Sequence, residues 1–189
     1  GLGVLVWVYF LSQLAGFVYP AVWSYIAIAK FGWTEGEIGI SLAAYGVLFV
    51  ICQAVVTPFL MPRIGERRVI WIAFALEAVA LIGLATAPTT LVLYLWLLPA
   101  LFTGMEGPAL QKVMTERTPP DAQGELQGGL SGLGAIVLIL SPLIYTQLFF
   151  AFQNGVGGVV FPGAPFVMAA VFNVIALALF VMRKRQTSA

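Results

Sequence analysis

Six long apolar stretches follow one another along the chain, separated by short polar or glycine-rich connections. They cover roughly residues 2–29, 37–61, 69–87, 90–114, 125–150 and 164–182. Each approaches or exceeds the about 20 apolar residues that a helix needs to cross a hydrocarbon core about 30 Å thick. None has the polar stripe at a 3.6-residue period that marks a helix on the surface of a soluble protein. The pattern predicts an all-α membrane protein, with one domain of six transmembrane helices over residues 1–189.

The composition strengthens this assignment and excludes several functions. Hydrophobic residues make up 61% of the 189 residues and charged residues only 9%, whereas soluble domains have about 25% charged residues. The chain has no histidine, and its single cysteine, Cys52, lies inside the second apolar stretch. We find no nucleophile–base pair, metal-ligand set or phosphate-binding loop. We therefore expect the protein not to be an enzyme and to hold no metal or cofactor.

Basic residues are distributed unequally between the two sides of the predicted bundle. Of the nine lysines and arginines, only Lys30 falls on one side. The other eight follow the second, fourth and sixth stretches: Arg63, Arg67, Arg68, Lys112, Arg117, Arg183, Lys184 and Arg185. The positive-inside rule makes their side cytoplasmic, so both chain ends are predicted to face the cytoplasm. Topology accounts for the basic residues, and no nucleic-acid partner is expected.

Four polar side chains interrupt the apolar stretches at a similar depth. At 1.5 Å per residue from the nearest basic residue, Gln53, Glu77 and Asn173 lie about 13–15 Å into the membrane. Gln13 holds a comparable position in the first stretch. Because transporter substrates bind near the bilayer midplane, these residues predict a substrate site. For the three amides, a hydrogen bond that merely joins neighbouring helices is an equally good interpretation.

Glu77 differs from the amides because it can carry a charge. An ionised side chain at the bilayer centre costs on the order of 2.5–3.5 kcal/mol even on the lenient insertion scale. No lysine or arginine lies at the same depth. The carboxyl is therefore expected to hold a proton in a dry state and to release it in a wetter one. We interpret Glu77 as a proton-coupling residue rather than a packing residue.

Glu106 lies nearer to the predicted cytoplasmic boundary. It is six residues before Lys112, which corresponds to a depth of about 9 Å. Pro108 leaves the carbonyl of Gly104 without its usual helical donor. A carboxyl at such a break is suited to bind a cation or to line a cytoplasmic exit, and Glu106 is our second candidate for proton coupling. It is equally suited simply to reach interfacial water, and the sequence leaves these interpretations open.

Local signals predict helix ends and one packing face. Thr34 and Glu37 have the spacing of a capping box at the start of the second helix. Thr118, followed by Pro119, is predicted to cap the start of the fifth helix. Three glycines with a spacing of four residues predict a face for close helix packing: Gly124, Gly128 and Gly132.

Five segments together carry a family resemblance. They are FGWTEGEIGISLAAYG (31–46), RIGERR (63–68), GPALQKVMT (107–115), QGELQG (123–128) and FPGAPF (161–166). In their order and spacing they resemble the C-terminal half, helices seven to twelve, of a major facilitator superfamily transporter. Within that superfamily, the chain is similar to the tetracycline/proton antiporter group.

The resemblance implies roles for particular residues. The segment at 63–68 is similar to a cytoplasmic loop motif whose side chains latch helix ends, here Arg63, Gly65, Glu66, Arg67 and Arg68. Glu77 matches an acidic residue that takes part in proton coupling in this group, and Gln53 matches a glutamine of the substrate region. The chain departs from the group at Phe49, where well-studied members have histidine, and at Glu106, where a small residue is usual.

These observations predict the C-terminal half of a proton-coupled drug efflux antiporter, of the kind that confers antibiotic resistance, in the bacterial inner membrane. Its expected partners are the lipid bilayer, protons, a small-molecule substrate and an N-terminal half outside this chain, because the substrate cavity of such transporters lies between two halves. The alternative is a non-transporting structural subunit packed against a larger membrane complex.

Overall fold

The computed structural model describes the backbone of residues 2–186 and the side chains up to residue 182. Within these residues the chain forms helices and contains no strand. The elements are α1 (Leu2–Gly16), α2 (Val18–Phe31), α3 (Glu35–Ile51), the π-helical turn η1 (Cys52–Val56), α4 (Thr57–Ile64), α5 (Glu66–Thr86), α6 (Thr90–Ala100), the 3-10 segment η2 (Leu101–Met105), α7 (Glu106–Thr115), η3 (Pro120–Ala122), α8 (Gln123–Gln153), η4 (Val156–Gly158) and α9 (Ala164–Gln186). The prediction of an all-α fold is confirmed.

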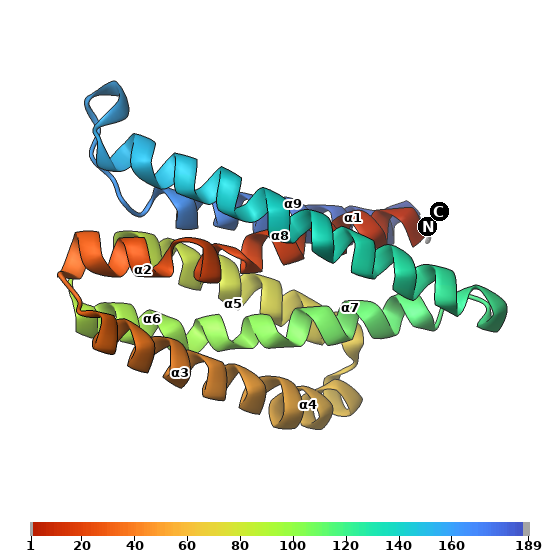
Figure 1. Cartoon of the computed structure of the whole chain (residues 1–189). Coiled ribbons are helices and arrows are strands. Elements are labelled where there is room, and N and C mark those ends of the chain that lie inside the picture. The colour runs from red at the N-terminus through yellow and green to blue at the C-terminus, as the bar shows by residue number, and fades with distance from the viewer. Residues whose placement is uncertain (1, 187–189) are drawn as a thin grey trace.

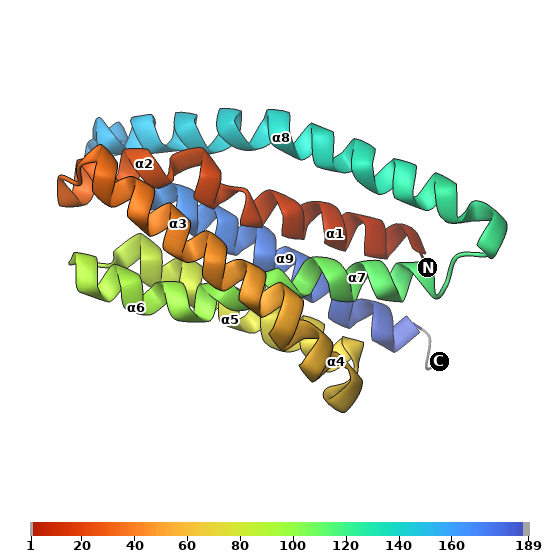
Figure 2. The same cartoon turned by 60° about the horizontal axis from the view of Figure 1, so that its bottom comes forward.

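Consecutive helices run on from one another to give six segments long and apolar enough to cross a membrane. These are Leu2–Phe31, Glu35–Ile64, Glu66–Thr86, Thr90–Thr115, Pro120–Gln153 and Ala164–Met182. Three of them combine two α-helices that follow each other end to end, namely α1–α2, α3–α4 and α6–α7 (Figures 1 and 2). The prediction of six transmembrane helices is confirmed.

Helices α5 and α9 form the centre of the bundle, whereas α3 and α8 lie at its edges (Figures 1 and 2). In the most apolar part of each span, 56% of the residues are buried in α5, against 17% in the α3–α4 span and 22% in the span that contains α8. Since all three helices are apolar, sequence hydrophobicity does not distinguish the core helix from those that expose most of their surface. The exposed faces of α3 and α8 are available to lipid or to another protein.

Two hydrophobic clusters divide the core at a level near the middle of the bundle. On α5, Phe74 belongs to one cluster and Leu81 to the other. On α9, Ala176 belongs to the same cluster as Phe74, and Ala169 belongs to the same cluster as Leu81. Glu77 lies between the two clusters, one helical turn from either side. A polar layer therefore separates two apolar layers.

Close backbone approach occurs at glycines other than the predicted stripe. A Cβ added to Gly83 would collide with the Trp96 ring, and one added to Gly163 would collide with the carbonyl of Ala85. By contrast, an added Cβ would meet nothing within 4 Å at any of Gly124, Gly128 and Gly132. The predicted stripe is exposed on α8, so a packing role for it remains a prediction that requires a partner outside the described residues.

One of the two predicted helix caps is confirmed. The Thr34 backbone N–H donates to a Glu37 carboxylate oxygen at 2.8 Å, and the Glu37 N–H donates to the Thr34 hydroxyl at 3.4 Å, which completes the capping box. The Thr118 prediction is wrong, because its hydroxyl donates back to the Met114 carbonyl at 2.9 Å. Pro119 has extended ψ and a 3-10 turn follows it, so α8 begins only at Gln123.

The start of α1 and the end of α9 lie at the same end of the bundle, together with the α4–α5 and α7–α8 connections (Figures 1 and 2). This end carries the predicted cytoplasmic loops. Lys30 lies at the opposite end, where its ammonium donates to the Ala85 carbonyl at 3.0 Å. The orientation of this bundle relative to a membrane remains a prediction.

Candidate functional site

The polar layer brings together three buried side chains from three helices. The Asn173 side-chain N–H₂ on α9 donates to Glu77 on α5 at 2.7 Å and to Glu106 at the start of α7 at 3.4 Å. The exposed fractions of these side chains are 0% for Glu77, 1% for Glu106 and 0% for Asn173. One neutral amide thus bridges two carboxyl groups inside the bundle. We call Glu77 and Glu106 the carboxyl pair and Asn173 its bridge.

The directions of the helices explain why Glu106 joins this group despite its shallower predicted depth. Side chains on a helix tilt toward its N-terminus. Successive spans run in opposite directions, so the side chain of Glu77 on α5 tilts toward the end where α5 begins, and that of Glu106 on α7 tilts the other way. The two side chains therefore lean toward each other across the α5–α7 contact. A depth count based on Cα positions alone misses this convergence.

Irregular backbone surrounds the site on two of the spans. The predicted break near Pro108 is present as η2, where the Glu106 N–H donates to the Thr103 carbonyl in a 3-10 pattern. On the facing span, the π-helical turn η1 contains Gln53, and the Thr57 hydroxyl donates to the Cys52 carbonyl at 3.0 Å. Such single π-turns inside α-helices frequently occur at functional sites.

No positive charge compensates the carboxyl pair among the described residues. Neither Glu77 nor Glu106 forms an ion pair there. Three atoms remain buried without a hydrogen-bond partner: Glu77 Oε1, Glu106 Oε2 and Asn173 Oδ1. Two ionised carboxylates in such a dry site repel each other and lose their hydration, which favours a state in which at least one of them holds a proton.

A cavity of about 420 Å³ adjoins the pair between α1, α2, α3 and the η2–α7 region. Gln13, Gln53 and Glu106 line it, as the substrate-site prediction requires for the two glutamines. Glu77 and Asn173 do not line it and lie behind Glu106. Asn173 contacts the two carboxyls, and its predicted contact with a substrate stays a prediction.

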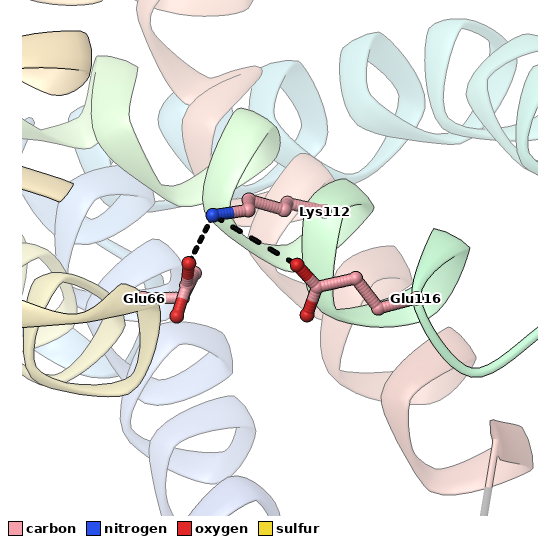
Figure 3. A network of polar contacts seen from close by, with 3 residues as sticks. All are labelled: Glu66, Lys112 and Glu116. Carbon is pink, nitrogen blue, oxygen red and sulfur yellow. Dashed lines mark hydrogen bonds and ion pairs between the residues drawn. The ribbon is translucent and has the colours of Figure 1, made fainter. Parts of the chain in front are cut away.

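The predicted latch loop forms one ionic contact between spans. Glu66, at the start of α5, pairs with Lys112 on α7, and Lys112 also lies 3.8 Å from Glu116 (Figure 3). The Arg63 guanidinium instead donates to the Phe59 carbonyl at 2.6 Å and lies over its ring. Among the described residues, the remaining two arginines of the predicted latch, Arg67 and Arg68, are exposed and have no ion pair.

Gly65 supports the latch through its backbone. It joins α4 to α5 with φ +82°, a conformation that residues with a Cβ rarely adopt. This turn places Glu66 at the beginning of α5, where it reaches Lys112.

Sequence reasoning missed several residues of the site. Lys112, the partner of Glu66, was read only as a topology marker. Tyr19 and Thr103 line the cavity although they belong to no recognised motif, and Tyr45 lines it from the segment at 31–46, where it has no predicted role. Tyrosines are common in apolar spans, so nothing in the sequence alone separates those that face a cavity from those that face lipid. Thr103 lies three residues before Glu106, and residues at this spacing share one face of a helix. This spacing is the only sequence signal that indicates that Thr103 faces the cavity.

The family of this chain follows from comparison with known proteins. The Major Facilitator Superfamily model matches residues 5–189, so the chain belongs to this superfamily. With its six spans, it has the fold of one half of such a transporter, as predicted.

The chain is similar to several tetracycline resistance proteins. The class G protein of Vibrio anguillarum is 36% identical over 151 residues, which cover 80% of this chain and 38% of that protein. The class C protein of Escherichia coli is 34% identical over 78% of this chain and 37% of its own length. The class H protein of Pasteurella multocida is 31% identical over 95% of this chain and 44% of its own length. The chain therefore spans less than half of the length of these relatives.

Proposed function

We propose that this chain is the C-terminal half of a proton-coupled antiporter that exports small drug-like molecules of the tetracycline type. The observation that carries the proposal is the carboxyl pair, which is buried next to a cavity in the middle of the bundle and has no ion pair among the described residues. The similarity to tetracycline resistance proteins supports the substrate class. Membership of a transporter superfamily also argues against an enzymatic role.

In this proposal the pair carries the exchanged proton. With the cavity empty and dry, at least one of Glu77 and Glu106 holds a proton. When the cavity opens to water or accepts a substrate, the ionised form becomes less costly and the proton leaves. Asn173 holds the two carboxyls at a fixed separation through its N–H₂ group, so a change of charge on one is felt directly by the other.

An N-terminal half is the proposed partner of this chain. Alternating access requires two bundles that rock about a site between them. The described residues supply one bundle, and the cavity is walled by helices of that bundle only. The chain covers 38% of its class G relative, which leaves room in such proteins for a second bundle. The exposed faces of α3 and α8 provide apolar surface against which it would pack.

The proposed location is the bacterial inner membrane, with both chain ends in the cytoplasm. The excess of basic residues at one end of the bundle supports this orientation. Cysteine labelling of intact cells tests it. A cysteine at Asn154, exposed after α8, should react with an impermeant reagent from outside, and one at Gln123 should react only after lysis. The reverse pattern would refute the orientation.

The function is tested by tetracycline uptake into everted vesicles driven by a pH gradient, because export from the cytoplasmic side carries the drug into such vesicles. Glu77→Gln keeps the hydrogen-bonding shape but removes the exchangeable proton, so proton-driven export should be lost while the protein inserts in normal amount. Glu125→Gln, at an exposed carboxyl near the start of α8, serves as the matched control and should export normally. Normal export by Glu77→Gln would refute a proton-carrying role for this residue.

A further inference from the structure

The wall of the cavity has a distinctive chemistry. Five aromatic side chains line it, and Glu106 is its single carboxyl: Tyr9, Phe17, Tyr19, Tyr45 and Phe49 are the aromatic residues. The Tyr19 and Tyr45 rings stack with centroids 5.2 Å apart, and Tyr45 and Phe49 follow at 6.0 Å. No lysine or arginine is among the described residues that line it. The lining of the cavity therefore combines the faces of aromatic rings with one acidic group.

Local packing places this aromatic row close to the carboxyl. A Cβ added to Gly104 would lie 3.3 Å from the Phe49 ring, so the absence of a side chain lets the ring rest on the η2 backbone. Gly104 is two residues before Glu106, and both line the cavity with Phe49. The row of rings and the carboxyl thus belong to one continuous surface.

Three polar atoms from residues of this surface have no partner. Glu106 Oε2, Tyr19 Oη and Thr103 Oγ1 are each buried without a hydrogen bond among the described residues. Glu106 itself is only 1% exposed. Buried polar atoms in native proteins are almost always satisfied. An oxygen acceptor and two hydroxyls on one cavity wall therefore point to a bound group that supplies the missing interactions.

We infer that the cavity takes an organic cation with an apolar, aromatic body, and that Glu106 selects for its positive charge. A cation over the aromatic row gains cation–π attraction, and its charge compensates the carboxylate that the protein leaves unpaired. An anion of the same shape meets the negative charge of Glu106 and the negative ring faces. Glu77 does not line the cavity, so it responds to the cation only through Asn173 and Glu106.

This inference rests on the proposed function and names the substrate class of the same site. It gives the two carboxyls different tasks, because only one of them meets the substrate. Glu106 is the one carboxyl among the described residues that line the cavity, so it gives this cavity a charge that a neutral residue at the same position would lack. Glu106 is the specificity-determining residue, and Glu77 remains the proton carrier.

The test is equilibrium binding to the full protein encoded by the gene, in lipid nanodiscs, with empty nanodiscs subtracted. The probes are tetraphenylphosphonium and tetraphenylborate, which have the same shape and opposite charges. The unmodified protein should bind the cation more tightly than the anion. Glu106→Gln should weaken cation binding at least tenfold, since hydrogen bonds and contacts to a charged partner are roughly twice as strong as neutral ones. Glu125→Gln, at an exposed carboxyl on α8 that does not line this cavity, should change it less than threefold.

Two further results make the test decisive. Glu106→Asp retains the charge and should keep most of the preference for the cation, which separates a charge effect from a folding defect. Equal binding of both probes by the unmodified protein, or unchanged cation binding by Glu106→Gln, would overturn the inference. Proton-driven tetracycline export together with equal probe binding would leave the proposed function standing. Cation binding that depends on Glu106, without any proton-driven export, would instead refute the proposed function alone.

Discussion

Two places in this molecule arrange two carboxyl groups around one nitrogen. At the end of the bundle, Lys112 lies between Glu66 and Glu116, and the side chains of these three residues are 45%, 28% and 58% exposed (Figure 3). In the middle, Asn173 lies between Glu77 and Glu106, and all three are buried. The geometry is similar, but the chemistry of the central nitrogen differs. It is the ammonium of Lys112 at the end of the bundle, which we call the rim, and the neutral amide of Asn173 in the middle, which we call the core.

The difference shows where the protein compensates charge itself. At the rim, the ammonium and the surrounding water stabilise the carboxylates, so the contact holds α5 and α7 together without needing anything else. In the core, both carboxyls are buried and no ion pair reaches them from the described residues. The positive charge must come from outside the chain, as a proton or as a charged substrate. The proposed site is therefore the place where the described residues leave two carboxyl groups without a compensating charge.

Replacing the neutral amide of Asn173 in the core by an ammonium group should abolish proton-driven export. Asn173→Lys brings a cation to the carboxyl pair, which stabilises the ionised carboxylates and removes the need for an exchangeable proton. We expect proton-driven export to fall at least a hundredfold, measured in everted vesicles. Comparison of protein amount and thermal unfolding with the unmodified protein controls for misfolding of the larger side chain. Export within twofold of the unmodified protein would show that the missing cation has no role in coupling.

Removing the bridge should weaken the bundle. Asn173→Leu leaves the carboxyl pair without its donor, and losing a buried hydrogen-bond partner costs about 1–3 kcal/mol. The midpoint of thermal unfolding in detergent should drop by several degrees. Val174→Leu, at the next position of α9 where the side chain is exposed, should leave it unchanged. Equal midpoints for the two variants would mean that the bridge contributes nothing to stability.

At the rim, removing the central nitrogen should have the smallest effect on stability of the substitutions considered. Lys112→Met breaks the contacts with Glu66 and Glu116, but exposed ion pairs contribute little and are screened by salt. We expect the unfolding midpoint to shift by less than about 2 °C and the small shift to vanish in high salt. If Lys112→Met lowered the unfolding midpoint more than Asn173→Leu does, the rim contact would be the stronger of the two, which contradicts this account.

The sequence alone was sufficient for the architecture and for part of the site. Length and apolarity identified six spans, and the depth count selected Glu77 and Asn173 because a polar residue far from any charge is conspicuous in an apolar helix. It did not bring Glu106 to the same level, since that convergence depends on side-chain tilt across antiparallel helices. Nor did it identify the aromatic wall, because helices in lipid expose aromatic residues as readily as they bury them.

Packing between spans was also beyond the sequence. The glycine stripe at 124, 128 and 132 has the favoured spacing but faces outward, whereas the close contacts use Gly83 and Gly163. Neither of these belongs to a repeat, and their partners, Trp96 and the Ala85 backbone, lie on other elements. Spacing on one helix indicates where close approach is permitted, and the partner helix decides where it occurs.

Infrared spectroscopy of the purified protein at pH 7 tests the central claim most directly, because a protonated carboxyl absorbs separately from an ionised one. Most of the remaining carboxyls in the described part of the chain are exposed, and Glu66 is paired with Lys112, so those groups should be ionised. We predict a protonated-carboxyl band in the unmodified protein that is absent from the Glu77→Gln/Glu106→Gln double variant. If the unmodified protein lacks this band, or if the double variant retains it in full, the buried pair does not hold the proton and the account is contradicted.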